Sequence, residues 1–203
     1  MRMIPSLVVV DDSPVAVLTP EVRTAAVPDV ASKNRPEMPQ TLEGCVVAVI
    51  DSDSPGQSES YFAKALIREL REEFAVAEVV WVKKANRTRP PEASVWQDVI
   101  ERADAGISMY GGCGTCSSRT MRDAIELQWA GIPSVAISHE DMRGAVESMR
   151  RISKADTPYV EVNRPTSASG AWTESETDAV VRRILPSVVA ELTSGRAPVR
   201  KTA

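Results

Sequence analysis

Beyond residue 44, the chain repeats two kinds of pattern, one typical of buried strands and the other of amphipathic helices. Short apolar runs rich in β-branched residues predict strands that are buried on both faces. Five such runs are present, at Val46–Ile50, Val79–Val82, Ala105–Tyr110, Val135–Ser138 and Tyr159–Val162. The segments that follow them carry apolar residues at helical spacing, which predicts helices after Ser54, over 92–103, over about 118–130, from Glu140 to about Ile152, and over 175–192.

This strand–helix alternation predicts an α/β fold: a three-layer, flavodoxin/Rossmann-like domain with a parallel five-stranded sheet. With the strands numbered along the domain, we expect the spatial order 2-1-3-4-5. Ligands of such sheets bind outside the carboxyl ends of the strands, where the order reverses. We therefore expect three loops to meet there, at 51–58, 111–118 and 138–141.

Local signals support two of the predicted helix ends. Ser54-Pro55-Gly56-Gln57 has the spacing of a capping box with proline at the first helical position. Gly131 and Pro133 follow the third helix as a C-cap and a stop signal.

The first 43 residues lack a helical period and contain six prolines. Leu7–Val10 and Val15–Leu18 predict two short strands, paired as a hairpin around Asp12-Ser13-Pro14. We interpret residues 1–43 either as an extended arm that contacts the domain or a partner subunit, giving a homo- or hetero-oligomer, or as a disordered tail. Residues 44–195 form the single predicted domain, and residues 196–203 are a flexible basic tail.

Composition narrows the class of protein. The chain has 203 residues, 43% of them apolar and 26% charged, as in ordinary globular proteins. A net charge of −4 argues against a nucleic-acid partner, and no apolar run is long enough for a membrane partner. The N-terminus lacks the apolar core of a signal peptide. Three cysteines, two of them in one CxxC, favour thiol chemistry in a reducing cytoplasm over a disulfide framework.

The motif with the clearest chemistry is the CxxC segment, Tyr110-Gly-Gly-Cys-Gly-Thr-Cys-Ser-Ser-Arg119. It follows a predicted strand and opens a predicted helix, so backbone N–H groups and the helix dipole favour thiolate over thiol. Arg119 and Arg122 would add positive charge. A zinc or iron–sulfur site usually needs four ligands, whereas only Cys45 and His139 remain, so we expect no metal. Two inert, buried cysteines are the remaining alternative.

The segment GGCGTCSSRTMRDAIELQWAGIP resembles the UGSC family of (seleno)proteins, which is named for a selenocysteine-Gly-Ser-Cys motif. Cys113 stands at the selenocysteine position, Thr115 replaces the serine, and Cys116 matches the final cysteine. Asp123, Ala124, Glu126, Leu127 and Gly131-Ile132-Pro133 match the following helix and turn. Upstream, VAVIDSDSPGQS resembles the strand and loop of the family, although serines replace its Asn and Lys. The resemblance covers nearly all of residues 15–192.

This resemblance implies redox chemistry, because selenium in place of sulfur marks a nucleophile or redox centre. It implies that Cys113 attacks as a thiolate and that Cys116 resolves the adduct. We therefore predict a thiol-dependent oxidoreductase that acts on a small-molecule substrate with no bound cofactor, its reductant being an external thiol.

Other residues at the predicted crevice are weaker candidates for substrate or anion binding: Asp51, Ser52, Ser54, Gly112, Gly114, Thr115, Ser117, Ser118, Arg119 and His139. Ser54 is primarily a helix cap, and the single histidine is either a cap for the helix after it or a functional group in the crevice. No dinucleotide or P-loop motif is present. Fold analogy alone does not justify a flavin.

Two further functions remain open at this point. Cys113 would act as a covalent nucleophile in acyl or C–S chemistry without net redox change, in a lyase or transferase. Alternatively, the CxxC belongs to a non-catalytic redox-sensing or assembly subunit.

Overall fold

The computed structural model describes residues 6–10, 13–17, 36–52, 61–163 and 173–194. The chain divides into two units, Met1–Val30 and Ala31–Ala203. The first contains β1 (Ser6–Val10) and β2 (Ser13–Val17), which pair as an antiparallel hairpin. The predicted hairpin is thereby confirmed.

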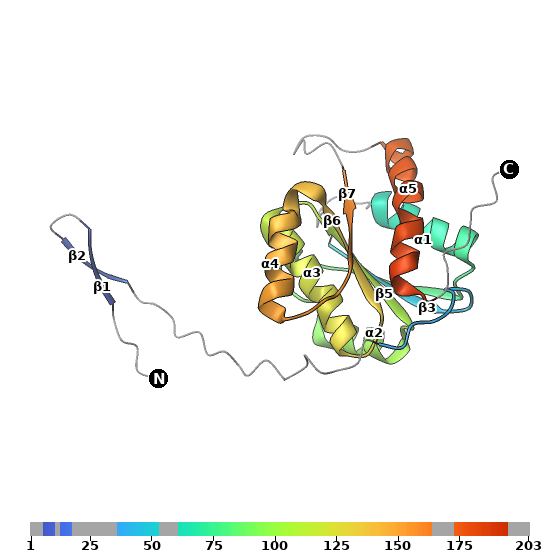
Figure 1. Cartoon of the computed structure of the whole chain (residues 1–203), viewed down its shortest axis with the longest axis horizontal. Coiled ribbons are helices and arrows are strands. Elements are labelled where there is room, and N and C mark those ends of the chain that lie inside the picture. Colours follow the sequence, from blue (N-terminus) through green and yellow to red (C-terminus); the bar gives the residue numbers. More distant parts are fainter. Residues whose placement is uncertain (1–5, 11–12, 18–35, 53–60, 164–172, 195–203) are drawn as a thin grey trace. The chain divides into compact units, whose positions relative to one another are not determined.

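The second unit is built on a five-stranded, all-parallel sheet, as the apolar runs predict (Figure 1). Its strands are β3 (Val46–Asp51), β4 (Glu78–Lys83), β5 (Ala105–Gly111), β6 (Ser134–His139) and β7 (Tyr159–Val162). Their spatial order is β4-β3-β5-β6-β7, which confirms the order 2-1-3-4-5. Every residue of the inner strands β5 and β6 is buried, because helices cover both faces of the sheet.

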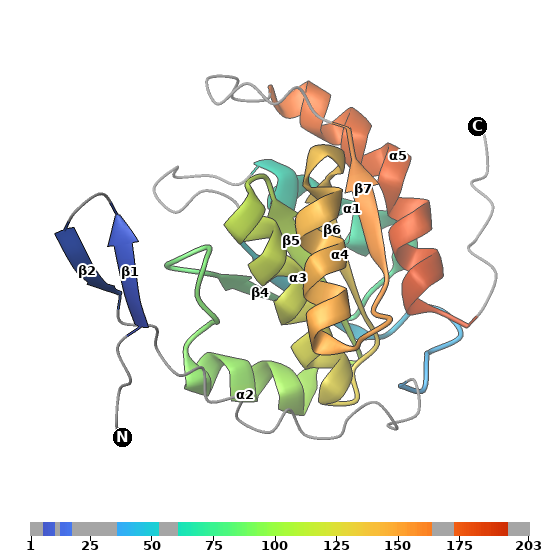
Figure 2. The same ribbon diagram turned by 60° about the vertical axis from the view of Figure 1, so that its left-hand side comes forward.

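Helices lie on both faces of the sheet and complete the three layers (Figure 2). They are α1 (Tyr61–Phe74), α2 (Ala93–Arg102), α3 (Gly114–Trp129), α4 (Arg143–Ser153) and α5 (Glu174–Leu192), with a short 3-10 helix η1 (Glu140–Met142) before α4. α1 and α5 pack on one face, and α2, α3 and α4 on the other. The fold class predicted from the sequence is confirmed.

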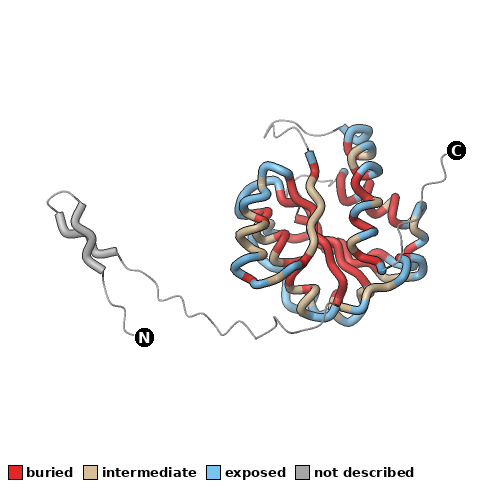
Figure 3. Tube along the Cα trace, in the orientation of Figure 1, coloured by how far each residue is buried: buried red, intermediate tan, exposed pale blue. Residues whose placement is uncertain are grey.

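The hydrophobic core lies between these layers (Figure 3). On the α1 and α5 face, Leu66 and Leu185 contribute to a large cluster with Ile107. On the opposite face, Ile50 and Leu127 belong to a smaller one. Within residues 36–43, Leu42 is buried in the first cluster, so this end of the predicted arm packs on the domain.

Two helix boundaries differ from the sequence prediction, and one prediction lies outside the described residues. α3 begins at Gly114, four residues before the predicted start, because Cys113 acts as its N-cap. The helix predicted from Glu140 is divided into η1 and α4. The capping box predicted at 54–57 falls in the segment 53–60, outside the described residues.

Candidate functional site

The CxxC lies at the carboxyl end of β5, as predicted, and forms the first turn of α3. Cys113 and Cys116 are joined by a disulfide, and the backbone N–H of Cys116 donates to Cys113 Sγ at 3.2 Å. The two residues differ sharply in exposure. Cys113 is exposed at the helix N-cap, whereas Cys116 is only 2% exposed and faces the protein interior.

Close backbone packing sets the position of this turn. A Cβ atom on Gly111, the last residue of β5, would lie 2.5 Å from both the Cα and Oγ atoms of Ser117. No side chain fits there, so glycine lets α3 approach the end of the strand. The N–H of Ser117 donates to the carbonyl of Cys113 at 2.8 Å and closes the first helical turn.

Two of the predicted neighbouring loops are tied to the strand that leads to the CxxC. The N–H of Ser52, after β3, donates to the carbonyl of Met109 at 2.5 Å. The hydroxyl of Ser138, near the end of β6, donates to the carbonyl of Gly111 at 3.2 Å. The structure therefore brings the ends of β3, β5 and β6 together at one edge. Ser54, the third predicted residue of the β3 loop, lies outside the described residues.

Asp51 and His139, two of the predicted site residues, are buried and accept hydrogen bonds from other parts of the protein. The Oδ2 atom of Asp51 accepts a hydrogen bond from the indole N–H of Trp81 at 3.0 Å. The Nδ1 atom of His139 accepts one from the backbone N–H of Asp141 at 3.0 Å, so the histidine is the N-cap of η1. The capping alternative for His139 is confirmed, although it caps a 3-10 helix.

The predicted glycine and hydroxyl residues divide into an exposed and a buried group. Gly112, Gly114 and Thr115 are exposed around Cys113, while the Ser118 hydroxyl donates to the carbonyl of Gly114 at 3.0 Å. Ser52 and Ser117 are buried. The buried hydroxyl oxygens of Ser52, Ser108, Ser117 and Thr120 have no hydrogen-bond partner within the described part of the chain. Two of these residues, Ser117 and Thr120, lie in the first two turns of α3.

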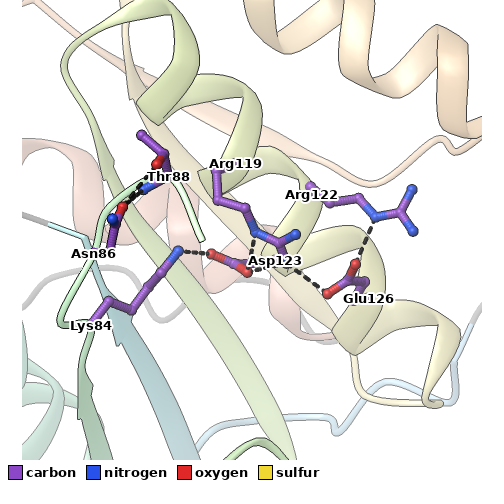
Figure 4. Close-up of polar contacts among 7 residues, drawn as sticks. All are labelled: Lys84, Asn86, Thr88, Arg119, Arg122, Asp123 and Glu126. Carbon is purple, nitrogen blue, oxygen red and sulfur yellow. Dashed lines mark hydrogen bonds and ion pairs between the residues drawn. The ribbon is translucent and has the colours of Figure 1, made fainter. Parts of the chain in front are cut away.

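A charge network that the sequence did not predict joins α3 to the residue after β4, and its central pair is buried (Figure 4). Lys84 Nζ, directly after β4, lies 2.5 Å from Asp123 Oδ2, and both side chains are almost fully buried. Arg119 donates to Asp123 Oδ1 through Nε at 2.8 Å and to Glu126 through Nη2 at 2.7 Å. Glu126 also accepts from Arg122 Nε at 2.7 Å.

This network changes the role expected for Arg119 and Arg122, which was to supply positive charge beside the CxxC. Both guanidinium groups are paired with carboxylates of the same helix, so the expected free positive charge beside the CxxC is reduced. The sequence shows only a lysine directly after a predicted strand and an aspartate on the helix that follows the CxxC. Neither shows that the two meet.

Burial shifts the protonation equilibria of the central pair toward the neutral forms. Burial raises the pKa of the Asp123 carboxyl, against the opposing effects of Arg119 and Lys84. Burial likewise lowers the pKa of the Lys84 ammonium, against the attraction of Asp123. Removal from water penalises both charges. The Asp123 carboxyl therefore gives up its proton less readily than an exposed carboxyl, and the Lys84 ammonium gives up its proton more readily than an exposed one.

Among the described side chains, no three of His, Cys, Asp and Glu gather as metal ligands would. None of the described helices has the length and apolar character needed to cross a membrane. A groove between α1 and β4, of about 360 Å³, is lined by Trp81, Arg68 and their neighbours and includes no residue of the predicted site.

The comparisons with known proteins agree with the motif. The model of the UGSC family matches residues 16–194, most of the chain including both cysteines of the CxxC. No curated protein matches the chain. No solved structure matches it either.

Proposed function

The chain belongs to the UGSC family, and from this premise we propose that it is a CxxC-dependent redox enzyme for a small-molecule substrate. Cys113 is the attacking thiolate and Cys116 the resolving thiol. The observation that carries the proposal is the difference in exposure within the pair. Cys113 is exposed and can react with a substrate from solution. Cys116 is only 2% exposed, so it reacts only with the adduct that forms on Cys113.

The surroundings of Cys113 favour its ionised form. It caps α3, a helix of 16 residues, so its sulfur lies at the positive end of the helix dipole. The N–H of Cys116 donates directly to this sulfur. Both effects stabilise a thiolate more than a thiol. Because Arg119 is paired with Asp123 and Glu126, the backbone supplies most of this stabilisation.

The proposed reaction is a two-electron reduction of the substrate by the dithiol. The Cys113 thiolate attacks a sulfur atom of the substrate, forms a mixed disulfide, and displaces the first leaving group as a thiolate. The Cys116 thiolate then attacks Cys113 Sγ, forms the intramolecular disulfide, and releases the rest of the substrate with the electron pair of the broken bond. An external thiol returns the disulfide to the dithiol. This cycle requires a reducing compartment, for which we propose the cytoplasm.

The exposed backbone beside Cys113 is where we place the substrate. Gly112, Gly114 and Thr115 surround the attacking sulfur and leave it open to solvent. The side chains of Asp51 and His139 already serve Trp81 and Asp141, so we assign them to support of the crevice. Contacts of a bound substrate would then come mainly from backbone N–H groups of this turn.

The test uses serine variants of each cysteine and glutathione disulfide as the probe. All proteins carry Cys45→Ser, since Cys45 is the remaining thiol; burial and then Asp104 raise its pKa, so we expect it to contribute little. The reduced Cys116→Ser protein should accumulate one glutathione adduct on Cys113, detected by intact mass. The Cys113→Ser protein should accumulate none. The protein with both cysteines should end as a disulfide without adduct.

Three results would contradict this proposal in different ways. An adduct on Cys116 in the Cys113→Ser protein reverses the two roles. No adduct in any variant removes the redox activity. Turnover of a substrate that does not depend on added dithiol would instead support a covalent, non-redox reaction at Cys113.

A further inference from the structure

The carboxyl end of β5 departs from regular strand geometry directly before the CxxC. Ser108 of β5 lies opposite Ala136 of β6, and the next pair is Gly111 with Ser138. Three steps along β5 therefore match two steps along β6, which makes β5 the bulged strand. An extra residue of this kind re-aims the groups that follow it, and bulges are over-represented next to active sites for that reason.

Two carbonyl groups show how the backbone changes direction at this bulge. The carbonyl of Met109 faces β3, where it accepts the N–H of Ser52 at 2.5 Å. The carbonyl of Gly111, two residues later, instead faces β6, where it accepts the hydroxyl of Ser138 at 3.2 Å. In a regular strand both carbonyls would point to the same side, because the backbone repeats every two residues. The peptide after Gly111 is therefore turned over relative to a regular strand.

This orientation directs a hydrogen-bond donor toward the crevice of the sheet. The peptide between Gly111 and Gly112 is trans, so its C=O and N–H point in opposite directions. The N–H of Gly112 thus points away from β6, toward the side of β3. Ligands of such sheets bind where the strand order reverses, which here is between β3 and β5. Because Gly112 is exposed, its N–H can donate to a group that binds from solvent.

The hydroxyl of Ser138 is what holds this peptide in place. Glycine adopts positive and negative φ values about equally readily, so a peptide between two glycines turns over easily. The backbone cannot be stiffened by a side chain at Gly111, because a Cβ atom there would lie 2.5 Å from Ser117 Cα. Ser138 is only 1% exposed and lies on an inner strand, so its hydroxyl is a rigid, water-free partner for the carbonyl.

We propose that Ser138 is a positioning residue for the CxxC reaction, holding the N–H of Gly112 toward the substrate sulfur that leaves when Cys113 attacks. This inference rests on the function proposed above and concerns its first half. In that step the Cys113 thiolate bonds to one substrate sulfur, and the substrate S–S bond breaks with its electron pair on the other sulfur. An N–H already aimed at the leaving sulfur stabilises the charge that develops there. A peptide that had turned over would direct its carbonyl oxygen at this charge instead.

The experiment follows the attack by Cys113 in the reduced full-length protein that carries Cys45→Ser and Cys116→Ser, where the adduct accumulates. The pH is set where Cys113 is fully ionised, so that a change in its pKa does not alter the rate. Glutathione disulfide leaves its charge on one sulfur, whereas an aromatic disulfide spreads the charge over a ring. Adding Ser138→Ala should slow adduct formation by about tenfold with glutathione disulfide and by less with the aromatic disulfide. The loss is smaller than the roughly 10²–10³-fold loss on removal of a donor itself, because the turned-over peptide is populated only part of the time.

Matched variants separate this role from packing. Ser134 lies on the same strand, is 3% exposed, and donates its hydroxyl to the carbonyl of Ala124 at 2.6 Å, at the opposite end of β6 from the CxxC. Ser134→Ala therefore removes the same kind of buried hydrogen bond and should leave both rates unchanged. Ser138→Thr and Ser138→Val have the same shape and differ in the hydroxyl, so the threonine variant should react faster with glutathione disulfide.

The outcomes distinguish this inference from the proposed function. A normal rate in Ser138→Ala, or equal rates in Ser138→Thr and Ser138→Val, would overturn the positioning role. An equal loss with both disulfides would show that the substitution restricts access or packing rather than charge stabilisation, and would also overturn it. Absence of the adduct in the protein that retains Ser138 would instead overturn the attack by Cys113 and with it the proposed function.

Discussion

The Lys84–Asp123 pair offers the most quantitative prediction, because one substitution leaves a buried carboxylate without its closest partner. Lys84→Ala removes an ammonium group 2.5 Å from Asp123 Oδ2, in a pair whose side chains are 1% and 0% exposed. Removing one partner of a buried ion pair costs about 3–5 kcal/mol. Arg119 still donates to Asp123, so we expect the lower end, a loss of about 3 kcal/mol at neutral pH.

The pH dependence of this loss has a definite sign. Burial raises the pKa of Asp123 in the folded protein above its value in the unfolded chain, against Arg119 and Lys84. Ionisation of Asp123 therefore lowers stability as the pH rises through its folded-state pKa, and Lys84 offsets part of that loss. Without Lys84 the pKa rises further. The variant should be most destabilised at neutral pH and less destabilised at acidic pH, where protonation of Asp123 removes the charge that lost its partner.

Urea unfolding followed by circular dichroism measures this difference at the two pH values. Arg102→Ala is the matched control, because Arg102 pairs with Asp98 and Glu78 at the surface and its loss should change stability little at either pH. A Lys84→Ala protein as stable as the parent at neutral pH would refute the cost assigned to the buried carboxylate. A loss of equal size at both pH values would refute the role of Asp123 ionisation.

Two further predictions concern the turn that carries the CxxC. Gly111→Ala places a Cβ atom 2.5 Å from the Cα of Ser117 and should cost about 1–3 kcal/mol in urea unfolding, whereas Gly114→Ala, whose Cβ meets no atom within 4 Å, should not. In the reduced protein, labelling with iodoacetamide against pH, followed by peptide mapping, should show Cys113 ionising below the free-cysteine value of about 8.5. If both thiols of the pair titrate at or above that value, the helix N-terminus does not activate Cys113.

Much of the fold was predictable because its signals are local. Apolar β-branched runs separated by amphipathic segments predict parallel strands with helical crossovers. The strand order was predicted by analogy with flavodoxin-like sheets and is the one observed. The position of the CxxC was predictable for the same reason, since its glycines and cysteines follow one of these runs. The start of α3 was predicted four residues late, because Gly114 and Thr115 are weak helix formers and the cap made by Cys113 outweighs that weakness.

The sequence by itself determined the layer architecture, the edge of the sheet where the candidate site lies, and the pair of cysteines that we propose to be reactive. Only the tertiary structure decided which cysteine is exposed and which partners the polar residues take. Lys84 meets Asp123 across 39 positions, and Asp51 meets Trp81 across 30. Periodicity and capping act over a few residues and can be read along the chain. A buried polar group takes its partner from whichever elements the packing of helices against the sheet brings beside it.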